Sequence, residues 1–510
     1  MIGTYGIPDP MNRLGVSIFE IELWVTQGKS MTVRTLLFRM LLCVGAFTVL
    51  TAVTEIGQAM PARIGTTAGR EPNTTLQVQS ESFLARVETV NYKGWNAYRL
   101  SNNLVTLIVV PDIGGRAIQL QIGKKELFFV NSAFAGKVLP ESENNPKAGF
   151  ANYGGDKLWP APEGWLSDQE WPSIPYFVLD GSRYQAEIVA NTSQEVALRV
   201  TSPGDPRTGI QFARTYHVYA GITRVRVDEV MRNVSRRQIR WGMWHLVQHD
   251  AADINDPSKP NPDFYMFVPL NPHSRYPEGY NHMYGDARHP SYDVVADGKM
   301  LRAHYLYRVG KIGVDSNRGW YAVVNGQKQT CFVETFKYFA EEEYPDNASV
   351  EAWNDGPGII HRDPFDQILK NDSKETPYFF ESEIMSPFIT LSPGEEHLFT
   401  VEWAVTNLPP IVVDSKWIGV VSEPLRATAS GNSVLLTGVF GVYSPGTLEA
   451  IFYDEHGVVL LQRKLLDVDP RATVKLNQNV ELPPGTFRIS ICVRAADGEN
   501  LGFLGNAMLP

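Results

Sequence analysis

Apolar and polar residues alternate with a period of two from about residue 75 onward, and Gly, Pro, Asn and Asp interrupt the alternation at intervals. Because successive side chains of a β-strand point to opposite faces, this pattern predicts strands joined by turns. No stretch here shows a convincing helical period, so we predict an all-β protein. The expected strands lie at residues 104–110, 116–122, 126–130, 185–190, 195–201, 210–219, 223–231, 238–249, 319–325, 330–339, 349–354, 378–384 and 397–405, and residues 250–298 are expected to be rich in loops.

The pattern changes around residues 408–410, where the sequence Leu-Pro-Pro is a natural linker. Beyond it the expected strands are short and evenly spaced, which predicts a small immunoglobulin-like β-sandwich of about 100 residues at 412–510. Before it, residues 75–408 are long enough to form one large β unit. We expect the chemistry in this larger unit and an accessory role for the C-terminal sandwich.

Residues 31–62 have the features of a secretory signal peptide. Arg34 and Arg39 precede an apolar run at 41–53, and small residues near 57–62 provide a cleavage site. The run is short for a membrane span, so we expect cleavage and no stable membrane insertion afterwards. Met31 is then the expected start, residues 1–30 are an upstream extension, and the mature protein is periplasmic or secreted.

The composition of the chain argues against some classes of binding partner. The formal net charge is −10, and no dense cluster of Lys and Arg offers the basic face that nucleic acid requires. Of the three cysteines, Cys331 and Cys492 lie beyond the signal peptide, so a scaffold resting on disulfides is excluded. A small neutral or polar ligand fits better, and the sequence indicates no cofactor.

His245 stands on the most informative expected strand, 238–249. On a strand Met243, His245 and His249 share one face, and Trp244 lies on the other. His245 and His249 would lie roughly 13 Å apart, too far to chelate one metal ion, so no metal site is expected. Two interpretations of His245 stay open: a proton donor facing a cleft, because the pKa of a free imidazole is near neutrality, or a buried structural histidine.

Glu381 and Glu383 belong to the expected strand 378–384 and should share one face, with Cα atoms roughly 7 Å apart. Two like charges so close raise each other's pKa where water is restricted, which would make one of them a base near neutral pH. The alternative is an exposed acidic face of an edge strand.

Residues 152–165, NYGGDKLWPAPEGW, combine glycines, an Asp-Lys pair, prolines and two tryptophans. Carbohydrates bind to flat aromatic faces and to charged or amide groups, so this stretch suits a sugar-contacting loop. In that interpretation Asp156 and Lys157 bind hydroxyl groups, and Trp159 or Trp165 stacks on a pyranose face. The alternative is a plug at the end of a β-sandwich, with the Asp-Lys pair in solvent.

Six segments, taken in order, resemble the galactose mutarotase-like superfamily and, more narrowly, the bacterial DUF4380 family. They lie at residues 103–121, 152–165, 214–235, 241–248, 344–354 and 380–396. The resemblance covers about residues 75–408. It implies a large twisted β-supersandwich that binds a sugar in an open cleft on one sheet, followed in this chain by the C-terminal sandwich.

The resemblance also implies roles for individual residues. In aldose mutarotases a glutamate takes the proton from the anomeric hydroxyl while a histidine protonates the ring oxygen. By position, His245 is the implied acid and Glu383 or Glu381 the implied base, and we expect them to meet in one aromatic-lined hollow. The sugar-contacting positions that it implies are Arg116, Asp156, Lys157 and Trp159.

The leading prediction is an exported carbohydrate-binding protein that takes a mono- or oligosaccharide, with aldose 1-epimerase chemistry as its catalytic form. The chief alternative is a non-catalytic glycan-binding protein, in which the same hollow holds a glycan without converting it. A glycosidase or polysaccharide lyase is a third alternative. Trp353 is expected to be either a second stacking platform or a core residue.

Overall fold

The computed structural model describes residues 83–144, 151–172, 174–286, 288–362 and 365–509. The predicted extension (1–30) and signal peptide (31–62) lie outside the described residues, so both stay predictions. No helix in the described ranges is both long and apolar enough to span a membrane.

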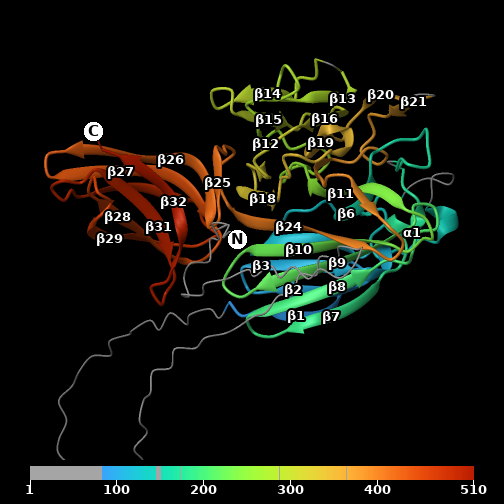
Figure 1. Ribbon diagram of the computed structural model, residues 1–510, viewed down its shortest axis with the longest axis horizontal. Helices are drawn as coiled ribbons and strands as arrows, with labels where there is room; N and C mark the ends of the chain where they lie inside the picture. Colours follow the sequence, from blue (N-terminus) through green and yellow to red (C-terminus); the bar gives the residue numbers. More distant parts are fainter. Residues whose placement is uncertain (1–82, 145–150, 173, 287, 363–364, 510) are drawn as a thin grey trace, which may run out of the picture. The chain divides into compact units, whose positions relative to one another are not determined.

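Strands make up nearly all of the regular structure, as Figure 1 shows, and the all-β prediction is confirmed. The one α-helix in the described ranges, α1 (Phe177–Asp180), has 4 residues. Short 3-10 helices lie at Pro111–Ile113, Glu141–Glu143 and Pro345–Asn347.

Two large sheets dominate residues before 408. The ten-stranded sheet has the order β14 (Tyr292–Val295), β15 (Met300–His304), β12 (Phe264–Pro269), β17 (Trp320–Asn325), β18 (Thr330–Phe336), β24 (Glu396–Asn407), β10 (Arg224–Asn233), β9 (Ile210–Tyr219), β8 (Glu195–Thr201) and β7 (Gln185–Asn191). The seven-stranded sheet has the order β13 (Asn281–Gly285), β16 (Gly310–Val314), β19 (Val350–Asn354), β22 (Phe379–Met385), β11 (Ile239–Asp250) and β23 (Ile389–Leu391), and β6 (Asp156–Ala161) also pairs with β11.

The remaining strands of the described residues form smaller sheets. A five-stranded sheet contains β1 (Arg86–Tyr92), β2 (Trp95–Ser101), β3 (Val105–Val110), β4 (Arg116–Ile122) and β5 (Lys125–Glu126), and β20 (Gly358–Arg362) pairs with β21 (Phe365–Leu369). Near the C-terminus one sheet has the order β25 (Asp414–Lys416), β26 (Gly419–Ser430), β27 (Ser433–Val442) and β30 (Val474–Glu481), and another has the order β29 (Val459–Val468), β28 (Gly446–Tyr453), β31 (Arg488–Arg494) and β32 (Asn500–Met508). Buried residues of both, such as Leu436 and Ile491, form a common hydrophobic cluster.

Two regions differ from the pattern expected from the sequence. Residues 156–161, expected in a loop, form β6, which is buried at every position and therefore shows no apolar–polar alternation. Residues 250–298, expected to be rich in loops, contain the short strands β12, β13 and β14. All five residues of β13 are half-buried, so it too has no clear inner and outer face in its sequence.

The ten- and seven-stranded sheets pack face to face around one hydrophobic core. The ring of His249 on β11 packs edge-on against Phe332 of β18, with ring centroids 5.0 Å apart. Tyr321 of β17 donates a hydrogen bond of 2.8 Å to the hydroxyl of Ser382 on β22. Both contacts join the two sheets, so the inner face of the seven-stranded sheet carries polar groups that must be satisfied within the core.

His245 of β11 lies in this core between two carboxylates. Its Nδ1 is 2.7 Å from Glu229 Oε1 on β10, its Nε2 is 3.2 Å from Glu334 Oε1 on β18, and all three side chains are fully buried. Burial would lower the pKa of His245, but Glu229 and Glu334 outweigh it and raise the pKa to about 9. Burial also raises the pKa of Glu334 to about 7.

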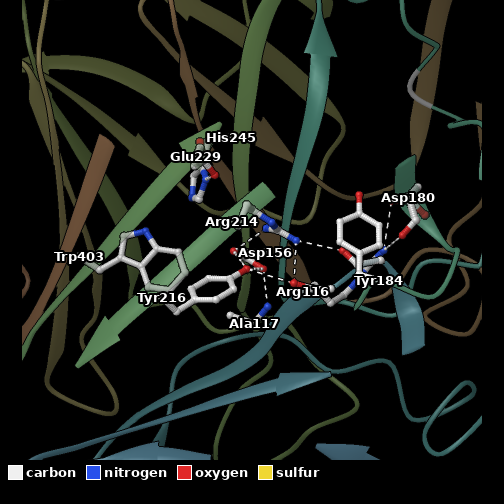
Figure 2. Close-up of polar contacts among 12 residues, drawn as sticks. Arg116, Ala117, Asp156, Asp180, Tyr184, Arg214, Tyr216, Glu229, His245 and Trp403 are labelled. Atoms are coloured by element: carbon white, nitrogen blue, oxygen red, sulfur yellow. Dashed lines mark hydrogen bonds and ion pairs between the residues drawn. The ribbon is translucent and has the colours of Figure 1, made fainter. Parts of the chain in front are cut away.

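A second buried polar cluster ties the five-stranded sheet to the other two (Figure 2). Asp156 of β6 accepts hydrogen bonds from Arg214 of β9 at 2.9 Å, from the Tyr216 hydroxyl at 2.9 Å and from the Ala117 N–H of β4 at 2.6 Å. Beside it, Arg116 pairs with Asp180 at 3.1 Å. Every charge in the cluster has a partner, as burial demands.

Two glycines before β4 let the chain approach this cluster. Gly114 has a φ of +83° and Gly115 a φ of +59°. A Cβ atom on Gly114 would lie 1.9 Å from the carbonyl oxygen of Asp180, which the structure does not allow. The carbonyl groups of both glycines accept hydrogen bonds of 3.0 Å from Arg214. The Gly-Gly-Arg sequence therefore serves the core, where no other residue type fits the backbone.

We expect Asp156→Ala to lower the free energy of unfolding by about 3–5 kcal/mol, because it leaves the Arg214 guanidinium buried without its counter-charge. The matched control is Asp293→Ala, which breaks the pair with Arg302 where both side chains are 40% or more exposed. That change should cost about 0–1 kcal/mol. Urea denaturation of both variants measures the difference, and equal small losses would show that the buried pair does not stabilise the fold.

The free energy of unfolding should fall as pH rises from about 4.5 to 9. The folded-state pKa of His245, about 9, exceeds its ordinary 6.5, so its contribution is complete below pH 6.5 and is lost toward pH 9. Glu334 acts in the same direction between its ordinary pKa of 4.5 and about 7, because the unfolded state releases the proton first. Urea denaturation at several pH values tests this. His245→Gln should flatten the decline above pH 6.5, and the exposed control His361→Gln should not.

Candidate functional site

The seven-stranded sheet presents a second face, opposite the core, and strand register determines which side chains reach it. In the antiparallel pairing Trp244 lies opposite Trp159, Leu246 opposite both Lys157 and Glu383, and Gln248 opposite Glu381. Residues directly opposite each other share a face. The same rule adds Glu351 opposite Glu383, Trp353 opposite Glu381 and Lys311 opposite Trp353.

Most of these side chains line a pocket of about 320 Å³, called here the outer pocket. Loops after β6 and β19 and the hairpin β20–β21 complete its wall. The aromatic and polar residues of its lining include Lys157, Trp159, Glu163, Trp244, Gln248, Lys311, Trp353, Asp355, Glu381 and Glu383, and the amide and charged side chains of Asn131, Asn152, Gln367, Lys374 and Glu375 also belong to it. Such a mixture of aromatic and polar groups in a concave site is typical of small-ligand binding.

Lys311 of β16 is held by three carboxylates. Its Nζ lies 3.0 Å from Glu163, 2.8 Å from Glu351 and 3.1 Å from Glu383, and none of these side chains is more than 3% exposed. The ammonium also lies 4.2 Å from the ring centre of Trp244. Burial lowers the pKa of Lys311, but the three carboxylates reverse this and hold it well above its ordinary value. Lys311 is therefore a permanent internal cation.

Lys157 of β6 has a different environment. Its Nζ lies 3.4 Å from Glu381 Oε1 and 4.8 Å from the ring centre of Trp159. Burial lowers the pKa of Lys157, and the nearby Glu381 offsets this in part. Glu381 also accepts a hydrogen bond of 2.7 Å from Gln248. Because the Glu381 side chain is 14% exposed, this group can meet a ligand directly.

Glu383 combines deep burial with partial compensation. Its Oε2 accepts a hydrogen bond of 2.7 Å from the indole of Trp244 and pairs with Lys311. Burial raises the pKa of Glu383 to about 7, Lys311 lowers it, and Glu381 raises it. A carboxyl group that titrates near neutrality can both accept and return a proton.

The structure brings together five of the nine site residues predicted from the sequence. Lys157, Trp159, Trp353, Glu381 and Glu383 all line the outer pocket. The expectation that the two glutamates share a face is confirmed by their register against Gln248 and Leu246. Trp165 is half-buried and does not line this pocket.

The structure corrects the predicted role of Arg116 and Asp156. Both were expected to contact a sugar, but both are buried in the core network and neither lines the outer pocket. The physical reason for Asp156 is the alternation of β6: Lys157 and Trp159 face the pocket, so Asp156 and Leu158 face the core.

The expected meeting of His245 with Glu383 in one hollow is also wrong. His245 pairs in register with Ile384, so it shares a face with that residue while Glu383 points the other way. The His245 ring is fully buried between Glu229 and Glu334 and does not line the pocket. The interpretation as a buried structural histidine fits this position.

Sequence reasoning missed most of the other residues that line the pocket, among them the buried polar side chains of Glu163, Gln248, Lys311 and Asp355. The alternation of β11 could have found Gln248, since it places this residue on the face of Trp244. Lys311 had no such signal, because β16 has only five residues, all of them buried, and two of them are glycines. The described residues contain no group of three His, Cys, Asp or Glu side chains placed to hold a metal ion.

Comparison with solved structures finds partial likenesses. A TPR-domain containing protein from Parabacteroides distasonis ATCC 8503 is 13% identical with a TM-score of 0.40; the match covers 63% of this chain and 48% of that chain, so this chain matches about half its length. A galactose mutarotase-like protein from Clostridium acetobutylicum is 10% identical with a TM-score of 0.39, covering 64% and 99% of the two chains. Another from Lactobacillus casei ATCC 334 is 9% identical with a TM-score of 0.36, covering 62% and 99%.

Comparison with protein families gives a match over more than half of the chain. No curated protein sequence matches it. The DUF4380 family, described as a domain of unknown function, matches residues 96–406. The membership predicted from the sequence is confirmed: this chain belongs to the DUF4380 family.

Proposed function

We propose that the outer pocket binds a carbohydrate. The observation that carries the proposal is the meeting of three indole rings, Trp159, Trp244 and Trp353, with charged and amide side chains in one concavity. Sugars offer C–H faces that pack on aromatic rings and hydroxyl groups that bind carboxylates, amides and ammonium groups. The proposal includes export of the protein, because the apolar run at residues 41–53 follows basic residues.

The size of the pocket favours one or two sugar rings at a time. Its volume of about 320 Å³ is at the lower end of the range for small-molecule sites, about 300–1,000 Å³. Trp353 is half-buried and its indole N–H lies 3.3 Å from Asp355 Oδ1, so the ring is fixed at the wall. A mono- or short oligosaccharide is therefore the proposed ligand.

A second candidate function is aldose 1-epimerase chemistry in the same pocket. It is favoured by Glu383, whose pKa of about 7 suits a general base, and by Lys157, whose pKa burial lowers. In this scheme Glu383 or Glu381 removes the proton of the anomeric hydroxyl. Lys157 then protonates the ring oxygen in place of a histidine, the ring opens, and it closes again on the other face of the aldehyde.

Trp353→Ala should weaken sugar binding by at least about tenfold, because truncation of a buried aromatic contact in a binding site commonly costs more than about 1.4 kcal/mol. The matched control is Trp417→Ala, since Trp417 is 63% exposed and lies outside the pocket. Isothermal titration with a panel of mono- and oligosaccharides measures both. Equal affinities of the two variants and wild type, or no binding of any sugar, would contradict the proposed function.

Epimerase activity would appear as faster α-to-β interconversion of fresh aldohexoses, followed by polarimetry or proton NMR. We expect at least one of Glu381→Gln and Glu383→Gln to lower the rate by about 100-fold or more, the usual contribution of a general base. The exposed Glu396→Gln is the matched control. If wild-type protein gives no acceleration while sugars still bind, the epimerase candidate is excluded and the binding proposal stands.

A further inference from the structure

Four buried acceptor atoms in the wall of the outer pocket have no hydrogen-bond partner among the described residues. They are Asn152 Oδ1, Gln248 Oε1, Asp355 Oδ2 and Glu383 Oε1. Gln248, Asp355 and Glu383 are 1%, 6% and 0% exposed, and Asn152 is half-buried. The orientation of the Gln248 amide is set by its neighbour, because its Nε2 donates to Glu381. Buried acceptors without partners cost free energy, so the pocket is built for a ligand that donates hydrogen bonds.

The charged side chains of the pocket also favour a ligand that donates hydrogen bonds. Lys311 has three hydrogens and lies within ion-pair distance of three carboxylates, so little donor capacity remains for a ligand. Lys157 already pairs with Glu381. Asp355 lacks an ion pair within the described part of the chain, and burial holds its pKa well above the ordinary value. The buried part of the wall therefore holds more carboxyl groups than ammonium groups, and the third lysine of the lining, Lys374, is exposed.

Asp355 and Gln248 both adjoin Glu381, at one end of the pocket. The Asp355 N–H donates to the Phe379 carbonyl at 3.4 Å, which places Asp355 next to the start of β22. Gln248 binds Glu381 directly, and Trp353 lies opposite Glu381 in the register. This corner, called here the acceptor corner, therefore combines carboxylates, an amide oxygen and an indole face. All three attract an ammonium group.

We propose that the acceptor corner recognises a protonated amino group, and that the ligand of the outer pocket is an amino sugar with a free amine. This inference rests on the proposed carbohydrate function and names its ligand class. An ammonium group supplies three donors and the missing positive charge. A uronic acid would bring a further carboxylate to a wall whose two buried lysines, Lys157 and Lys311, are already paired, and an N-acetylated sugar has lost the charge.

Isothermal titration at pH 6.5 with glucosamine, glucose, N-acetylglucosamine and glucuronate tests the proposal. We expect glucosamine to bind at least about tenfold more tightly than glucose, the increment of one hydrogen bond to a charged group. Glucuronate should bind more weakly than glucose. In Asp355→Asn the preference should disappear, so that the ratio of glucosamine affinity to glucose affinity falls to about one. The matched charge-removing control is Asp297→Asn, at an exposed position outside the pocket.

Each other outcome overturns the proposal in a distinguishable way. If glucose and glucosamine bind equally, or glucuronate binds best, the amino-sugar inference falls and the carbohydrate function stands. If the preference survives in Asp355→Asn, with folding of the variant confirmed by its thermal transition, the acceptor corner does not hold the amine. If methylamine binds as tightly as glucosamine, the ligand is an amine but not a sugar. If no probe binds, the proposed function falls together with this inference.

Discussion

The buried ion pair between Asp156 and Arg214 is the contact on which the arrangement of the three sheets depends. It joins β6 to β9, and the Ala117 N–H and the carbonyl groups of Gly114 and Gly115 extend the cluster to the five-stranded sheet. Two charges taken out of water are tolerable only when hydrogen bonds satisfy the rest of their polar atoms, and Tyr216 and the backbone do this here. The cluster thereby fixes the rotation of β6 about its own axis.

That rotation has a direct consequence for the outer pocket. With Asp156 directed into the core, Lys157 and Trp159 are directed away from it and toward Glu381 and Trp244. The indoles of Trp159 and Trp244 meet edge-to-face with centroids 5.3 Å apart. A core ion pair therefore sets the position of a ligand-binding wall on the other side of the same strand, because adjacent side chains of a strand cannot turn independently.

Two groups of titratable residues lie on the two faces of the seven-stranded sheet, and burial shifts the pKa of members in both. The inner group, with His245 between Glu229 and Glu334, is fully buried, lies outside the pocket lining and joins the two sheets. The outer group, with Glu381 and Glu383 beside two lysines, borders the pocket. A shifted pKa alone does not distinguish a functional carboxyl from a structural one; access to an opening does.

The sequence by itself determined the all-β class, the approximate place of strands such as β11 and β22, and the common face of Glu381 and Glu383. These follow from local rules, since alternation within a single strand needs no knowledge of its neighbours. The register of the strands and the order of the sheets decided which side chains face the core and which face the pocket. Which face of β11 is the core, whether Asp156 or Lys157 meets a ligand, and that Lys311 joins Glu383 all depend on partners more than 50 residues away in the chain. Alternation is symmetric about a strand, so the direction of the core is fixed only when the second sheet is in place.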